Sequence, residues 1–127
     1  MANQHEFRLQ CAVADYLRRM ALPGVYWTAL PFGEKRSKAT AGRLKRAGVR
    51  AGAADFFLLF HGFPVMLELK LATDATLGTK KTYQNADQKA TQADFEAAGG
   101  RYFLAHGYDE AIAILHRINY VREDRNR

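Results

Sequence analysis

Apolar residues recur every three or four positions along the first part of the chain, which is the repeat of one face of an α-helix. The apolar positions are Phe7, Cys11, Ala14 and Leu17, with Val13 and Met20 beside them. Charged residues fall largely between these positions. The spacing predicts an amphipathic helix over residues 4–20, ended by the Pro23-Gly24 pair.

Four shorter segments are rich in β-branched, aromatic and other apolar residues, as strands are. They cover residues 25–30, 55–60, 63–70 and 101–106. Only His61 and Gly62 separate the second segment from the third, and this pair suits a tight turn. The second and third segments are therefore predicted to form an antiparallel hairpin.

Helix signals fill the remaining stretches. A short helix is expected within residues 34–50. Asn85 followed by Gln88 matches a capping box, which predicts a helix that ends before Gly99-Gly100. Asp109 is expected to cap a last helix. The resulting order, α-β-(α)-β-β-α-β-α, predicts an α/β fold in which helices flank a mixed central sheet.

The composition fits one soluble globular domain over residues 1–127, with 48% hydrophobic and 25% charged residues. Its apolar runs are far shorter than the roughly 18 residues that a membrane helix needs, and the N-terminus lacks a signal-peptide pattern. Cys11 is the only cysteine, so no intrachain disulfide can form. We therefore expect no membrane partner and a reducing, cytoplasmic location.

The positive charge is concentrated in one segment. The chain has 19 Lys and Arg against 13 Asp and Glu, a net charge of +6, which favours polyanionic partners. Residues 34–50 hold seven of the basic residues and one acid. A solvated surface also explains such a run, but its place just before the candidate site favours phosphate binding. The nucleic-acid-binding candidates are Arg36, Lys38, Arg43, Lys45, Arg46 and Arg50.

Three charged residues meet at the predicted hairpin. A turn centred between His61 and Gly62 places Asp55 opposite Glu68, and Cβ atoms of such pairs lie about 4.5–5.5 Å apart. Lys70 lies two residues beyond Glu68 and so shares its face. Two facing carboxylates repel each other unless a cation lies between them or one is protonated. Ligands of this kind suit Mg²⁺ or Mn²⁺.

A purely structural interpretation of these residues stays open at this point. Glu68 and Lys70 also fit the exposed face of a half-buried strand, and Asp55 fits a strand edge after a turn. The arrangement further depends on register, because a slip of one residue moves the side chains to opposite faces.

Three motifs follow one another in order along the chain. They are Gly48-Val49-Arg50-Ala51-Gly52-Ala53-Ala54-Asp55, then Glu68-Leu69-Lys70, then Gln88-Lys89 before a helix that ends in Gly99-Gly100. Together they resemble the VRR-NUC family of the PD-(D/E)XK nuclease superfamily, which implies a restriction-endonuclease-like αβββαβ core. Many members have Gly-x-Pro-Asp where this chain has Gly52-Ala53-Ala54-Asp55. The chain therefore lacks the rigid proline before the aspartate but keeps every metal-ligand atom that the resemblance implies.

The resemblance also implies roles for individual residues. Asp55, Glu68 and the backbone carbonyl of Leu69 would bind Mg²⁺ or Mn²⁺, and Lys70 would be the catalytic lysine that positions the attacking water. Glu6 and Gln88 would assist, since the family has an acidic residue in its first helix and a glutamine at the start of the helix after the second motif.

Three of the assisting positions allow a second interpretation. Glu6 lies three residues after Asn3 and also fits a helix cap, as Gln88 does after Asn85. Gln10 matches a family glutamine and lies one helical turn after Glu6, where a solvated pair is equally consistent.

The function that the resemblance implies is a metal-dependent DNA endonuclease. Small members act as homodimers on branched DNA, including four-way junctions, which also implies a bacterial or phage-infected host cytoplasm. The alternative is a non-catalytic basic module that binds DNA through a degraded nuclease fold, and an RNA-processing nuclease is a third hypothesis. Both DNA hypotheses predict salt-sensitive binding, and only the enzyme needs Asp55, Glu68 and Lys70 for turnover.

Overall fold

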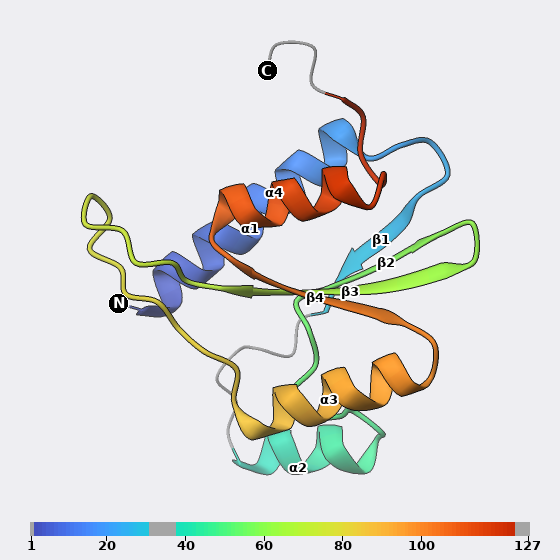
Figure 1. Ribbon diagram of the computed structural model, residues 1–127. Coiled ribbons are helices and arrows are strands. Elements are labelled where there is room, and N and C mark those ends of the chain that lie inside the picture. The colour runs from blue at the N-terminus through green and yellow to red at the C-terminus, as the bar shows by residue number, and fades with distance from the viewer. Residues whose placement is uncertain (1, 31–37, 124–127) are drawn as a thin grey trace.

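The computed structural model describes residues 2–30 and 38–123 of the chain. The elements are α1 (Ala2–Met20), β1 (Tyr26–Ala29), α2 (Lys38–Arg46), β2 (Phe56–Phe60), β3 (Phe63–Lys70), α3 (Ala86–Ala97), β4 (Arg101–His106) and α4 (Tyr108–Arg117). Their order is the predicted one. In Figure 1 the sheet lies between two pairs of helices, with α1 and α4 on one side and α2 and α3 on the other.

The four strands form one mixed sheet in the order β1-β2-β3-β4. The β1–β2 and β2–β3 pairs are antiparallel, and the β3–β4 pair is parallel. Phe56 faces Leu67 in the β2–β3 pair, which is the predicted register. The turn between these strands has positive φ at both His61 (50°) and Gly62 (81°), as a two-residue type I′ hairpin turn requires.

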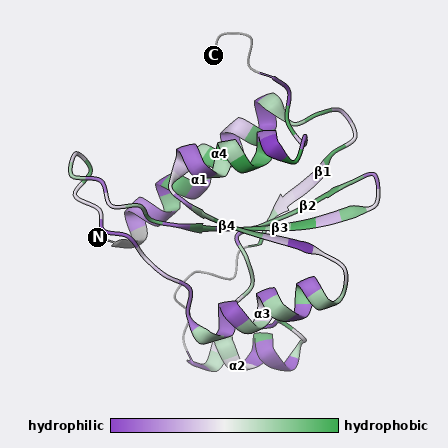
Figure 2. Ribbon diagram, viewed as in Figure 1, coloured by the Kyte–Doolittle hydropathy of each residue, from purple (hydrophilic) through white to green (hydrophobic). Residues whose placement is uncertain are grey.

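The hydrophobic core lies on the sheet face that α1 and α4 cover. Its fully buried side chains include Leu17 of α1, Phe56 and Leu67 of the hairpin, and Leu115 of α4. Alternation along the strands turns the neighbouring residues to the opposite face, toward α3. Figure 2 shows largely apolar central strands and helices that mix apolar and hydrophilic residues, as helices that cover a sheet do.

The helix after the β3–α3 loop begins as predicted. Asn85 is its N-cap, and the Asn85 side chain accepts from the Gln88 backbone N–H while the Gln88 side chain accepts from the Asn85 N–H. This reciprocal pair satisfies two backbone donors that a helix start otherwise leaves unbonded. The start of α3 is therefore fixed in place beside the sheet.

Two expected helix starts are wrong. The first helix begins at Ala2, so residue 3 lies inside it and does not precede it. The last helix begins at Tyr108 with Gly107 as its cap, not Asp109. Gly107 has φ 90°, which lets the chain turn from β4 directly into the helix. No side chain caps this helix, and Glu110 of its first turn instead accepts from the His106 backbone N–H of β4 at 3.1 Å.

Candidate active site

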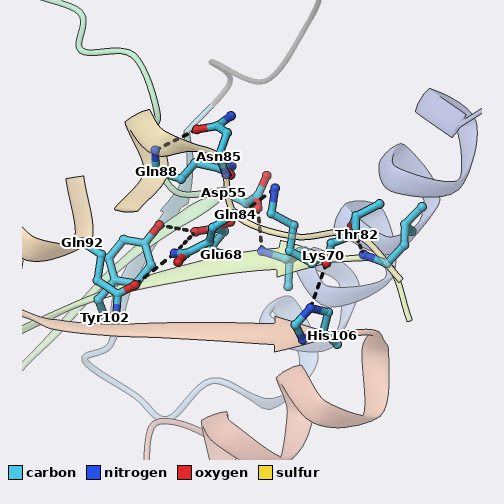
Figure 3. Close-up of polar contacts among 12 residues, drawn as sticks. Asp55, Glu68, Lys70, Thr82, Gln84, Asn85, Gln88, Gln92, Tyr102 and His106 are labelled. Carbon is cyan, nitrogen blue, oxygen red and sulfur yellow. Dashed lines mark hydrogen bonds and ion pairs between the residues drawn. The ribbon is translucent and has the colours of Figure 1, made fainter. Parts of the chain in front are cut away.

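Asp55, Glu68 and Lys70 converge on the sheet face that looks toward α3 (Figure 3). Asp55 directly precedes β2, and the other two residues lie near the end of β3. Regular pairing stops at Asp55, because its backbone N–H donates to the Leu67 carbonyl at 3.1 Å. The Asp55 side chain reaches β3 instead, where Oδ2 accepts from the Leu69 N–H at 2.7 Å. The three residues therefore cluster as predicted, but the prediction that Asp55 pairs directly opposite Glu68 is wrong, because the regular ladder begins at Phe56 and Leu67.

Glu68 is the most enclosed of the three, with none of its surface exposed. Its Oε1 accepts from the Tyr102 hydroxyl at 2.5 Å and from Gln84 Nε2 at 2.9 Å. Its Oε2 has no hydrogen-bond partner among the described residues and lies 3.4 Å from Lys70 Nζ. The interpretation of Glu68 as part of an exposed strand face is therefore wrong.

A buried carboxylate with an unbonded oxygen is unfavourable without a compensating positive group. The Lys70 ammonium supplies one such charge, and its side chain is only 15% exposed. Because Oε2 makes no hydrogen bond to that ammonium, it keeps lone pairs for another cation. This oxygen is the first indication in the structure that the cluster suits a metal.

Burial raises the pKa of Asp55 from 3.8 to about 6. The Leu69 N–H opposes this shift and the negative charge of Glu68 adds to it, while Lys70 lowers the pKa and Glu6 raises it by smaller amounts. A carboxyl group with such a pKa is readily ionised near neutral pH when a cation arrives, and it holds a proton in mildly acidic solution.

The backbone of β3 adds an oxygen on the same side. The Leu67 carbonyl accepts from Asp55, whereas the Lys70 carbonyl accepts from the Gly107 N–H on the β4 side. Backbone groups alternate along a strand, so the N–H and carbonyl of Leu69 share the side of Leu67. The N–H of Leu69 meets Asp55 there, and its carbonyl points to the edge that β2 leaves open.

The oxygens of Asp55, Glu68 and Leu69 fit a hard divalent cation such as Mg²⁺ or Mn²⁺. Within residues 2–30 and 38–123, no three His, Cys, Asp or Glu side chains gather into a metal-binding group. A cation at this place would therefore depend on two carboxylates, the Leu69 carbonyl and water, which Mg²⁺ commonly retains.

The assisting residues lie at different distances from this cluster. Glu6 is exposed on α1, yet its charge acts on Asp55, so it lies within electrostatic reach of the cluster. Gln88 belongs to the capping box of α3, where its Oε1 accepts a hydrogen bond from the Asn85 backbone N–H at 3.0 Å. Gln10 is partly buried on α1 and forms no hydrogen bond with Asp55 or Glu68, both of which lie in the described part of the chain.

Gly52 joins the turn before Asp55 to the start of α3. It has φ +82°, and a Cβ at this position would lie 2.4 Å from the Asp87 backbone carbon. Only glycine permits this approach. The backbone of Asp55 is fixed on both sides, since its carbonyl accepts from Leu30 at 2.7 Å and its N–H donates to Leu67. Hydrogen bonds thus hold Asp55 in place without the proline that many VRR-NUC members have before this residue.

The basic candidates divide into three groups. Lys38, Arg43, Lys45 and Arg46 are exposed on α2. Arg50 is also exposed, but its guanidinium forms an ion pair with Asp94 of α3 at 2.5 Å. Arg36 lies outside the described residues.

Sequence reasoning missed two residues that touch Glu68. Tyr102 is buried on β4, and burial followed by its hydrogen bond to Glu68 raises the pKa of its hydroxyl. Gln84 lies in the loop before α3, and its Nε2 also donates to Gln92 at 3.0 Å. No local motif marks either residue, because β4 reaches β3 only through the tertiary fold.

The structure also bears on the expectations about membrane helices and the single cysteine. None of the helices in the described part of the chain is both long and apolar enough to cross a membrane. Cys11, the single cysteine, is free and partly buried on α1.

The chain resembles a known protein in structure, but no family model or curated protein matches its sequence. No protein-family model matches the chain, and no curated protein matches it either. Among solved structures, a VRR_NUC domain protein superposes with a TM-score of 0.66 at 21% sequence identity. The match covers 94% of this chain and 92% of that one. The chain therefore has the fold of a VRR_NUC domain protein, a restriction-endonuclease-like α/β core.

Proposed function

We propose that this protein is a metal-dependent DNA endonuclease of the VRR-NUC type. One observation carries the proposal: Glu68 is wholly buried, and its unbonded Oε2 faces Lys70 beside Asp55. Most buried carboxylate oxygens in proteins have a hydrogen-bond partner, and a bound ion is one explanation for an oxygen that has none. A cation site next to a lysine accounts for all three groups, and the fold shared with a VRR_NUC domain protein is consistent with it.

Mg²⁺ or Mn²⁺ would supply positive charge to a phosphate oxygen as the bond to phosphorus breaks. Asp55, Glu68 and the Leu69 carbonyl would hold the ion. The Lys70 ammonium, 3.4 Å from Glu68 Oε2, would orient the attacking water and share in neutralising the phosphate. Attack by water forms one phosphorus–oxygen bond while another breaks, so no covalent enzyme intermediate is needed. Glu6 and Gln88 would assist from the two flanking helices.

The exposed cations of α2 would bind the DNA backbone. Figure 1 places α2 beside α3, on the side of the sheet that carries the cluster. Its four basic side chains are exposed to solvent and are therefore accessible to DNA phosphates. Arg36 and Arg50 would extend this surface, Arg50 after exchanging Asp94 for a phosphate.

Branched DNA, such as a four-way junction, is the substrate that the family resemblance favours. A homodimer would carry two such sites and make paired cuts. Tyr26, Leu59 and Phe63 are large, exposed apolar residues of the β1–β2–β3 part of the sheet, and they support self-association. Sedimentation velocity should give the mass of two chains, and a single 14.3 kDa species would contradict the dimer.

The decisive experiment is cleavage of end-labelled four-way junction, flap, nicked and linear duplex DNA in Mg²⁺, Mn²⁺ or EDTA. Wild-type protein is compared with Lys70→Ala and Glu68→Gln. We expect metal-dependent cutting, fastest on the junction, that falls at least about 100-fold in both variants because each removes a charge from the reacting centre. Binding of the junction in EDTA should change little.

Lys80→Ala and Glu96→Gln are the matched controls, because both residues are exposed and lie outside the cluster. Both controls should cut at the wild-type rate. Intact DNA binding without cutting of any substrate would contradict the nuclease and favour a non-catalytic binding module. Preferential cutting of RNA would favour the RNA-processing hypothesis.

A further inference from the structure

The carboxylate of Glu68 is held asymmetrically. Both of its hydrogen-bond donors, the Tyr102 hydroxyl and Gln84 Nε2, meet the same oxygen, Oε1. The other oxygen faces Lys70 and makes no hydrogen bond among the described residues. Figure 3 shows Tyr102 and Gln84 together on the side of Glu68 away from Lys70.

The two donors are themselves fixed. Tyr102 is buried on β4, in the strand that pairs directly with β3. Gln84 Nε2 has two hydrogens, and these go to Glu68 Oε1 and Gln92 Oε1. The neighbouring Asn85 is anchored as the cap of α3. The Gln84 amide cannot turn away without losing its hydrogen bond to Gln92, and burial restricts the Tyr102 side chain.

The loop that carries Gln84 is also tied down just before it. Thr82 donates its backbone N–H to the Leu71 carbonyl at 3.1 Å and accepts from the Leu71 N–H through its hydroxyl at 2.8 Å. The Thr82 carbonyl contacts His106 Nε2 at 2.9 Å. Bonds on both sides of Gln84 therefore set where its amide lies.

We propose that Tyr102 and Gln84 are positioning residues that occupy Glu68 Oε1 and leave Oε2 alone to bind the metal. This inference rests on the proposed function. Without the two donors, the carboxylate could rotate and offer either oxygen, or both, and its orientation toward Lys70 and Asp55 would be lost. Partners of this kind typically contribute 10- to 100-fold to metal affinity.

The test measures binding of Mn²⁺ to the full chain without DNA, by counting free Mn²⁺ with electron paramagnetic resonance. Tyr102→Phe removes one donor and keeps the ring. Gln84→Met removes the other and keeps the length of the side chain. We expect each variant to bind Mn²⁺ about 10- to 100-fold more weakly than wild type. Tyr108→Phe, which removes a partly exposed hydroxyl on α4, and Gln4→Met, on exposed α1 surface, should bind as wild type does.

Cleavage at increasing Mn²⁺ separates positioning from catalysis. High Mn²⁺ should restore the rate of Tyr102→Phe and Gln84→Met toward that of wild type, whereas Lys70→Ala should stay slow. Thermal unfolding in EDTA identifies a variant that has simply lost its fold, and Gln84→Met tests the loop independently of the buried tyrosine.

The possible failures are distinguishable. If wild type binds Mn²⁺ and both variants bind it equally well, the positioning role is overturned and the proposed nuclease stands. If the wild type neither binds Mn²⁺ nor cuts DNA in its presence, the proposed function fails and this inference fails with it.

Discussion

Asp55 is the residue whose charge depends most on its surroundings. Its side chain accepts one backbone hydrogen bond and shares a half-buried site with Glu68 and Lys70. Burial raises its pKa to about 6, so the folded protein holds a proton in a pH range where the unfolded chain has released it. Ionisation of Asp55 therefore lowers the free energy of unfolding when no cation is bound.

The sign of the resulting pH dependence follows from the raised pKa. In EDTA, the stability contributed by Asp55 is fully present below about pH 4 and is lost as the pH rises through 6. The loss is on the order of 2–3 kcal/mol for a shift of this size. Asp55→Asn cannot ionise, so its free energy of unfolding relative to wild type should rise between pH 4 and pH 7.

Urea unfolding at pH 4, 5, 6 and 7 measures this difference. Asp15→Asn, on the exposed side of α1, controls for replacing a carboxylate by an amide and should show no comparable trend. Mg²⁺ should reduce the wild-type loss above pH 6, because a bound cation favours the ionised carboxylate. A constant gap between Asp55→Asn and wild type across the whole range would show that Asp55 is not buried as described.

At the scale of elements, the site depends on how closely the 51–54 turn approaches α3. Gly52 has a positive φ and nearly touches the Asp87 backbone. Gly78 also has a positive φ, 71°, but has open space around it. A substitution at Gly78 therefore introduces backbone strain alone, whereas one at Gly52 introduces backbone strain and a steric clash.

Gly52→Ala should destabilise the fold more than Gly78→Ala. Both substitutions pay about 1–3 kcal/mol for a left-handed backbone conformation, and only the first also forces α3 away from Asp55. Chemical denaturation compares the two free energies of unfolding, and cleavage assays compare the activities. Equal stability and equal activity of the two variants would mean that the turn does not fix the start of α3.

Local and long-range elements differ in how far the sequence predicts them. The hairpin and the capping box are set by neighbouring residues, so the register of β2 and β3 and the start of α3 were predictable. Asp109 was wrongly assigned as a cap because a glycine turn after β4 made a side-chain cap unnecessary. Tyr102 and Gln84 reach Glu68 only through the pairing of β4 with β3 and the path of a loop, and neither leaves a sequence pattern.

At the scale of the whole molecule, charge is distributed unevenly across the sheet. The exposed cations of α2 lie on the side that carries Asp55 and Glu68, and α1 and α4 lie on the other side. Under the proposed function, a DNA backbone bound to α2 would lie on the same side of the sheet as the cluster. The salt dependence of DNA binding tests whether α2 binds the backbone.

The double variant Arg43→Ala/Arg46→Ala should bind a four-way junction more weakly and with a smaller salt dependence. Each lost phosphate contact lowers the slope of log K against log salt by about 0.9. Arg18→Ala/Arg117→Ala removes the same charge from exposed positions of α1 and α4, and its slope should change much less. Fluorescence anisotropy in EDTA from 50 to 200 mM salt gives both slopes. Equal slopes for the two double variants would rule out α2 as the binding surface.

Strand β3 pairs with β2, which directly precedes it in the sequence, and with β4, which follows much later. This order has a consequence for synthesis of the chain. The β2–β3 hairpin already contains Asp55, Glu68 and Lys70 next to one another, but Tyr102 and the strand that encloses Glu68 begin only at Arg101. A growing chain that has emerged only as far as the hairpin therefore lacks the Tyr102 hydroxyl that bonds Glu68 in the folded protein. Under the proposed function, the orientation of Glu68 that metal binding requires would therefore arise only when β4 docks against β3.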